Sequence, residues 1–79
     1  MSNALEDAQA QVAEAESAVS EADTNVNQAQ VELLAAKQGS AKVEIDQAEI
    51  NVNQAKVELM AAQEKLKTAK ETLWTAQGG

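Results

Sequence analysis

Two nearly identical stretches decide the fold of this chain, NVNQAQVELLAAKQ at residues 25–38 and NVNQAKVELMAAQE at residues 51–64. In both stretches a large aliphatic residue recurs every seven positions, and an alanine follows it three positions later. This alternation of three- and four-residue steps is typical of helices that pack along a narrow seam. The repeat therefore predicts two helices with equivalent faces, and not two copies of a binding motif.

The same spacing extends through most of the chain. One series of large aliphatic residues, at heptad position a, comprises Leu5, Val12, Val19, Val26 and Leu33, then Ile45, Val52, Leu59, Leu66 and Leu73. The second series, at position d, is all alanine and comprises Ala8, Ala15, Ala22, Ala29 and Ala36, then Ala41, Ala48, Ala55, Ala62, Ala69 and Ala76. Because neither series contains a polar residue, we expect both to lie in a closely packed helix–helix seam.

The hairpin turn is expected at Gly39 and Ser40. The alanine series steps from Ala36 to Ala41, five residues instead of seven, so a single unbroken helix would lose its seam there. Glycine tolerates the left-handed conformation that ends many helices, and serine is a favoured first cap of the next one. We therefore expect one unit over residues 1–79, with a helix at about 3–37, a turn at 38–40 and a helix at about 41–77.

Other end signals and the charge distribution favour antiparallel helices. Asn3 followed by Glu6 resembles a capping pair, and Gly78 with Gly79 should end the second helix. Residues 1–36 hold seven acidic side chains and no lysine, whereas the end of the second helix is rich in lysine. Antiparallel packing would place Lys65, Lys67 and Lys70 beside Glu6, Asp7, Glu14 and Glu16, each pair contributing about 0.3–0.5 kcal/mol. The expected fold class is all-α, an antiparallel two-helix coiled-coil hairpin with an Ala-rich seam that assembles into a larger helical bundle.

Two registers between the helices are compatible with the pattern. One places Val26 near Ala55, Leu33 near Ala48 and Val12 near Ala69, so that each layer holds one large side chain and one alanine. A register shifted by one heptad would do the same, because the pattern repeats every seven residues.

Seven large apolar residues fall outside the seam, at heptad positions f and b. They are Val31, Leu34, Val43, Ile50, Val57, Met60 and Trp74. Isolated surface hydrophobic residues are common, but the seven-residue spacing of Val43, Ile50 and Val57 favours a second interface. The rest of this face on the first helix carries Ser17, Ser20, Thr24 and Asn27, which are small and uncharged.

Composition argues against several classes of function. The chain has no His or Cys, its only internal glycine is in the turn, and its net charge is −7. We therefore expect no enzyme, no catalytic residue, no cofactor, no metal site and no nucleic-acid partner. Glu14 and Glu21 share a face, but the inward positions are apolar, so a solvated acidic face is the better interpretation. We see no signal peptide or membrane-spanning stretch, expect no direct membrane insertion, and leave the compartment open.

Residues 33–73 resemble the α-helical hairpin of haemolysin-D-type membrane fusion proteins, the periplasmic adaptors of efflux and secretion systems. Gly39, Ser40, Glu44, Asp46 and Ala48 approximate that family's tip pattern, although the step from Gly39 to Glu44 is one residue shorter. The chain also has no arginine for the tip contact with an outer-membrane channel, and no flanking lipoyl or barrel domains. The resemblance implies a helical hairpin that acts as an adaptor between proteins.

Three functions are compatible with these patterns. We expect a non-enzymatic structural protein, a hairpin that forms a homo-oligomer or packs on partner helices as a small component of a bacterial or phage assembly. The first alternative is a protein-binding adaptor or inhibitor that uses the exposed Val/Ile face. The second is the periplasmic adaptor hairpin that the resemblance implies.

Overall fold

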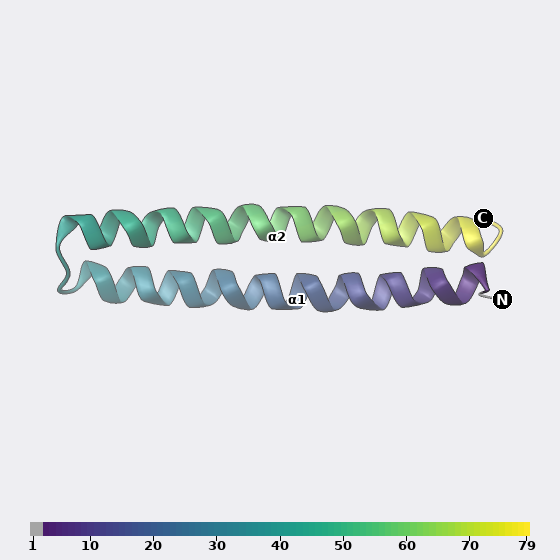
Figure 1. The fold of residues 1–79 in the computed structure, drawn as a ribbon, viewed down its shortest axis with the longest axis horizontal. Coiled ribbons are helices and arrows are strands. Elements are labelled where there is room, and N and C mark those ends of the chain that lie inside the picture. Colours follow the sequence, from purple (N-terminus) through teal and green to yellow (C-terminus); the bar gives the residue numbers. More distant parts are fainter. Residues whose placement is uncertain (1–2) are drawn as a thin grey trace.

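A computed structural model describes residues 3–79 as an antiparallel pair of long α-helices. Helix α1 spans Ala4–Lys37 and helix α2 spans Lys42–Ala76, and the two lie side by side along their whole length (Figure 1). The Cα trace measures 56 × 17 × 14 Å, and the first residue of α1 and the last residue of α2 lie at the end opposite the turn. The predicted fold class, an all-α two-helix coiled-coil hairpin, is confirmed.

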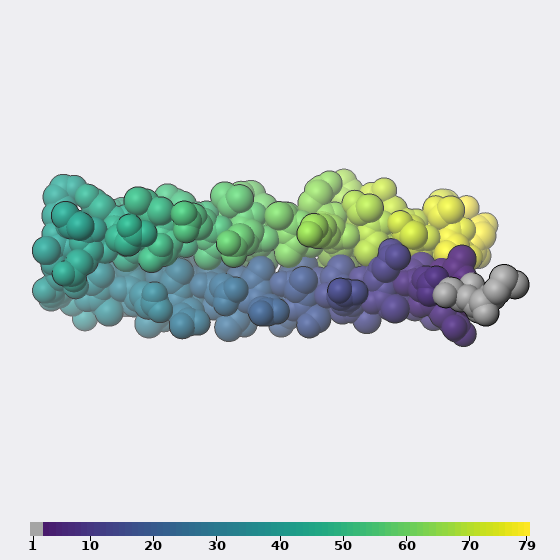
Figure 2. Space-filling model, in the orientation of Figure 1, coloured from purple at the N-terminus to yellow at the C-terminus, as the bar shows by residue number. Residues whose placement is uncertain are grey.

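The packing seam consists of the two predicted series. Within α1 and α2, every side chain that is buried or half-buried belongs to the a or the d series, and every other residue is exposed. Ala41 is the one member that the sequence assigned to the seam wrongly, because it is exposed and precedes the first turn of α2. Figure 2 shows the two arms in contact along the rod, as small seam side chains permit.

The middle of the seam establishes the register. Val26 and Ala29 of α1 form one buried cluster with Val52 and Ala55 of α2. Leu33 and Leu59 pack against this cluster while remaining half-buried. The grouping matches the register that places Val26 near Ala55, and a shift of one heptad would separate these residues by about 10 Å along the axis. Each layer therefore pairs a large side chain with an alanine from the other helix.

The turn differs from the expectation at both of its named residues. Gly39 does not adopt a left-handed conformation, and α1 instead ends in right-handed geometry at Gln38. The amides of Gly39 and Ser40 donate to the Ala36 carbonyl at 3.3 and 2.9 Å, so they are satisfied without a left-handed residue. The cap of α2 is Ala41, in an extended conformation and without a side-chain hydrogen bond, so Ser40 is not the cap.

The outer ends of the hairpin follow the sequence signals more closely. Asn3 Oδ1 accepts a hydrogen bond from the Leu5 amide at 2.8 Å, as an N-cap does, whereas no bond returns from Glu6 to Asn3. At the other end Gly78 has φ +87°, and the Gly79 amide donates to the Trp74 carbonyl at 3.1 Å. This is the Schellman arrangement, in which a left-handed glycine closes the helix. It also brings the Gly79 backbone against the Trp74 ring, where a side chain would collide.

The expected ion pairs between the helices are absent from residues 3–79. The one salt bridge there joins Lys42 and Asp46 at 2.8 Å within α2, and both side chains are exposed. Glu14 and Lys65 line the same shallow groove between the helices, but no ion pair joins them. Exposed pairs contribute little and immobilise long side chains, so charge gives at most a weak preference for the antiparallel orientation. The lysines near the end of α2 also stop short of its last turn, which carries no basic residue.

Candidate interaction surface

The seven apolar residues outside the seam are all exposed in the hairpin. Their exposed fractions range from 48% for Ile50 to 78% for Val43. The complete set is Val31, Leu34, Val43, Ile50, Val57, Met60 and Trp74. Single exposed hydrophobic residues are ordinary in soluble proteins, so their arrangement on the helices decides whether they form a surface.

Five of these seven residues lie on α2, and three of the five lie in the half of α2 nearest the turn. Val43, Ile50 and Val57 occupy successive f positions, which face away from the seam, and we call these three residues the α2 stripe. The stripe is about 21 Å long at 1.5 Å per residue. Met60 continues it at the neighbouring b position. The α2 stripe is therefore a narrow apolar band on the face of α2 that points away from α1.

Helix α1 carries only a short version of this band. Val31 and Leu34 are the counterparts in the repeat of Val57 and Met60. Further from the turn, the same face of α1 carries small polar residues, and the Thr24 hydroxyl donates to the Ser20 carbonyl at 3.1 Å. The back of α1 is therefore less apolar than the back of α2.

A shallow groove crosses the α2 stripe. Its lining residues are Ile50, Asn53, Gln54, Val57 and Glu58. Four of them, at positions i, i+3, i+4 and i+7, outline the kind of hole that receives one side chain from a facing helix in a coiled coil. The two polar members, Asn53 and Gln54, are uncharged and offer amide donors and acceptors. The groove therefore suits a side chain from another helix.

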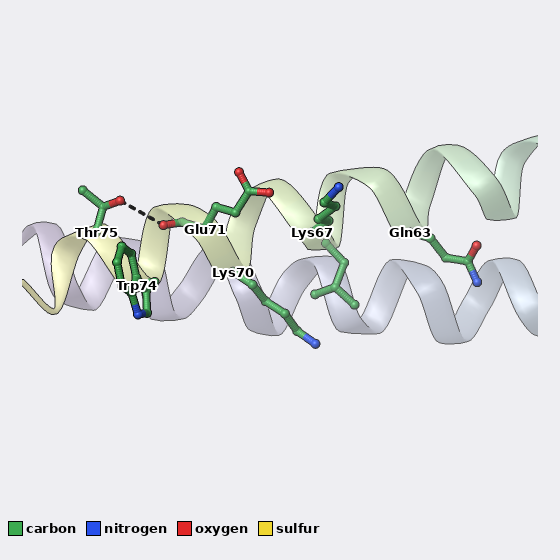
Figure 3. A pocket seen from close by; sticks show the side chains of 7 residues that line it. Gln63, Lys67, Lys70, Glu71, Trp74 and Thr75 are labelled. Atoms are coloured by element: carbon green, nitrogen blue, oxygen red, sulfur yellow. Dashed lines mark hydrogen bonds between the residues drawn. The ribbon is translucent and has the colours of Figure 1, made fainter. Parts of the chain in front are cut away.

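A second shallow groove surrounds Trp74 near the free end of α2. Figure 3 shows the indole ring beside Lys70 and Glu71, while Lys67 and Gln63 point in other directions from the helix. The Thr75 hydroxyl donates to the Glu71 carbonyl at 3.1 Å, so it is already satisfied locally. This open groove presents one aromatic face among exposed charged side chains.

Polar chemistry within residues 3–79 lies at the surface. The described buried residues are all alanine or valine, and none of them is polar or charged. In the same part of the chain, no three acidic side chains come together as metal ligands would. No helix there is both long enough and apolar enough to cross a membrane. Exposed helix faces are thus the features of this structure that can make specific contacts.

Compared with known protein families, with curated proteins and with solved structures, the chain matches none of them. The geometry of the hairpin and the chemistry of its surface are therefore what indicate its function.

Sequence reasoning placed all seven apolar residues outside the seam, but it missed two local features. The groove at Ile50 was not anticipated, although the i, i+3, i+4, i+7 spacing of its four outlining residues is visible in the sequence. The contact between Gly79 and the Trp74 ring was also missed, because it depends on the path of the chain after the last helical turn.

Proposed function

We propose that this protein is a non-enzymatic structural module, a helical hairpin that assembles through the apolar back of its helices. The observation that supports this most directly is the α2 stripe, three large side chains at seven-residue spacing on a face that α1 does not cover. A heptad-spaced apolar band is the feature by which one α-helix packs against another. Helix α2 already packs against α1 through its seam, so this second band can receive a further helix.

The small core of the isolated hairpin also supports assembly. No large side chain among the described residues is fully buried, and the buried set consists of six alanines and two valines. The hairpin exposes 5717 Å², whereas a globular monomer of 8.3 kDa exposes about 4,600 Å². Chains of this size commonly add stability through disulfides, metals or oligomerisation, and this sequence contains no cysteine. Burying the α2 stripe against another helix would increase the apolar surface that is removed from water, which is small in the seam alone.

The distribution of polar groups is consistent with a structural role. A catalytic site needs convergent polar groups in a cavity that excludes water, and the grooves of this hairpin are shallow and open. The charged side chains point outward from two convex helices, where they keep the rod soluble. We therefore propose that the protein acts through contacts between helices and not through chemistry on a small molecule.

Sedimentation velocity over a range of protein concentrations tests this proposal. We expect the wild-type chain to associate in the micromolar range and the double variant Ile50→Glu, Val57→Glu to remain monomeric. The matched control is Asn25→Glu, Gln28→Glu, which adds the same charge at exposed positions of α1. Circular dichroism of each variant, recorded at low concentration, checks that the helices persist.

Two results would contradict the proposal. If the wild-type chain stays monomeric at several hundred micromolar, self-assembly is wrong, and the α2 stripe would serve a different protein as an adaptor or inhibitor would. If the double variant associates as well as the control, the α2 stripe is not the assembly surface.

A further inference from the structure

The outward face of α2 next to the turn is nearly free of charge. Its f, b and c positions between residues 43 and 61 are all exposed, and one of the nine is ionised. These positions are Val43, Asp46, Gln47, Ile50, Asn53, Gln54, Val57, Met60 and Ala61. The single charge, on Asp46, is partly offset by Lys42, whose Nζ lies 2.8 Å from Oδ2. This face can therefore approach another protein without burying an unpaired charge.

The corresponding nine positions of α1, between residues 17 and 35, also include one charged residue, Glu21, but only two large apolar residues, Val31 and Leu34. Further from the turn, the same face of α1 adds three exposed carboxylates and no lysine. Helix α1 carries seven acidic residues and one lysine, a net charge of −6, whereas α2 carries six acidic residues and five lysines, a net charge of −1. Two copies of a chain with net charge −7 repel each other, and the repulsion is weakest where their α2 faces meet.

We propose that the α2 stripe is the interface of a two-fold symmetric dimer, in which α2 of one copy packs antiparallel against α2 of a second copy. The inference rests on the proposed function and names its partner. The two-fold axis passes close to Ile50, so the Ile50 side chains of the two copies meet at the axis, each at the edge of the other's groove. Val43 of each copy then lies alongside Val57 of the second copy. A two-fold interface requires a self-complementary surface, and the stripe has the same seven-residue spacing on both sides of Ile50.

The antiparallel orientation follows from charge and from the helix dipoles. In a parallel pair each residue would meet its own copy, so Asp46 would face the second copy's Asp46. In the antiparallel pair the two Asp46 carboxylates are more than 10 Å apart along the axis. Antiparallel helices also align their dipoles favourably. Gln47 and Gln54 lie on the same side of the stripe, where side-chain amides of the two copies can hydrogen-bond to each other.

The size of the surface predicts a weak dimer. The α2 stripe is about 21 Å long and one residue wide, which places the buried area below about 1,200 Å² in total. Interfaces of this size are typical of transient complexes, so we expect dissociation in the micromolar range. Higher salt should strengthen the dimer, because it screens the repulsion between two acidic chains.

Single cysteines test the geometry, because the wild-type chain contains none. With a short bismaleimide, we expect Ile50→Cys to give a cross-linked dimer, because the two sites lie beside the axis. Val43→Cys alone should cross-link several-fold less, because its two copies lie at least about 20 Å apart. A mixture of Val43→Cys and Val57→Cys chains should recover the dimer. Asn53→Cys, which keeps Ile50, is a second probe beside the axis, and Ser17→Cys on the back of α1 is the control.

Each alternative result is decisive. Equal cross-linking of Val43→Cys and Ile50→Cys would indicate parallel packing and overturn the proposed orientation. If the chain associates but Ser17→Cys cross-links while Ile50→Cys and Asn53→Cys do not, the interface lies on α1, and the inference fails while the proposed assembly role stands. If the wild-type chain does not associate at any concentration, both proposals are wrong.

Discussion

Val26 of α1 and Ala55 of α2 lie in one buried cluster at the middle of the hairpin. The pairing of a large side chain with an alanine recurs along the seam, so the distance between the helices depends on the alanines remaining small. This relationship makes the alanine positions as important for stability as the valines and leucines opposite them.

Enlarging a seam alanine should therefore destabilise the hairpin. We expect Ala55→Leu to lower the free energy of unfolding by about 1–3 kcal/mol, because the added atoms have no space between the helices. Thermal unfolding followed by circular dichroism at low concentration measures the effect. Ala35→Leu is the matched control, since Ala35 is exposed on α1. Equal melting temperatures for the two variants would show that the alanine seam does not limit the approach of the helices.

Removing a seam valine should also destabilise the hairpin, whereas removing an exposed valine should not. Val52 is 5% exposed and Val43 is 78% exposed. We expect Val52→Ala to cost about 1–3 kcal/mol through lost apolar burial and an unfilled cavity. Val43→Ala should change the stability of the monomer by less than about 0.5 kcal/mol. The comparison uses urea unfolding at a concentration below dimer formation, and a larger loss for Val43→Ala would contradict the assigned seam.

The sequence suggested Asn3 and Ser40 as the N-caps of the two helices. Replacing each of them should change the stability of the hairpin by different amounts. Asn3→Ala removes a side-chain acceptor that lies 2.8 Å from the Leu5 amide, and we expect it to cost about 1 kcal/mol. Ser40→Ala removes no helix cap, because Ala41 caps α2 without a side-chain bond, so its effect should stay below about 0.5 kcal/mol. Hydrogen exchange of the first amides of each helix reports both effects. Faster exchange of the first α2 amides after Ser40→Ala would show that Ser40 does cap α2 and would contradict this prediction.

The two glycines near helix ends should likewise differ. Gly78 has φ +87°, so Gly78→Ala should destabilise the end of α2 by about 1 kcal/mol. Gly39 is not left-handed, and a β-carbon there would meet nothing within 4 Å. Gly39→Ala should therefore be neutral or stabilising by up to about 1 kcal/mol, because it restricts the unfolded chain.

Fluorescence of the single tryptophan measures the first of these two effects directly. The Gly79 backbone lies against the Trp74 ring, so opening the end of α2 should shift the emission to longer wavelength. Gly39→Ala serves as the control and should leave the emission unchanged. A shift caused by Gly39→Ala and not by Gly78→Ala would contradict the assigned conformations.

The sequence by itself determined which residues of the two helices face inward. The a and d series contain no polar member, and an amphipathic helix buries its apolar stripe regardless of local detail. The same periodicity placed Val43, Ile50 and Val57 on the outward face, because position f lies opposite the seam. Only Ala41 was assigned wrongly, since a residue that ends the turn need not follow the helical period.

Only the tertiary structure decided the register, the conformation of the turn and the absence of ion pairs between the helices within residues 3–79. A heptad pattern matches itself after every seven residues, so the connection between the helices must select one register, and here it places Val26 beside Ala55. The turn depends on backbone hydrogen bonds to the Ala36 carbonyl, which composition does not reveal. Lysine side chains near acidic residues remain solvated unless packing holds them in place. The free energy gained from an exposed ion pair is smaller than the side-chain entropy lost in fixing both partners.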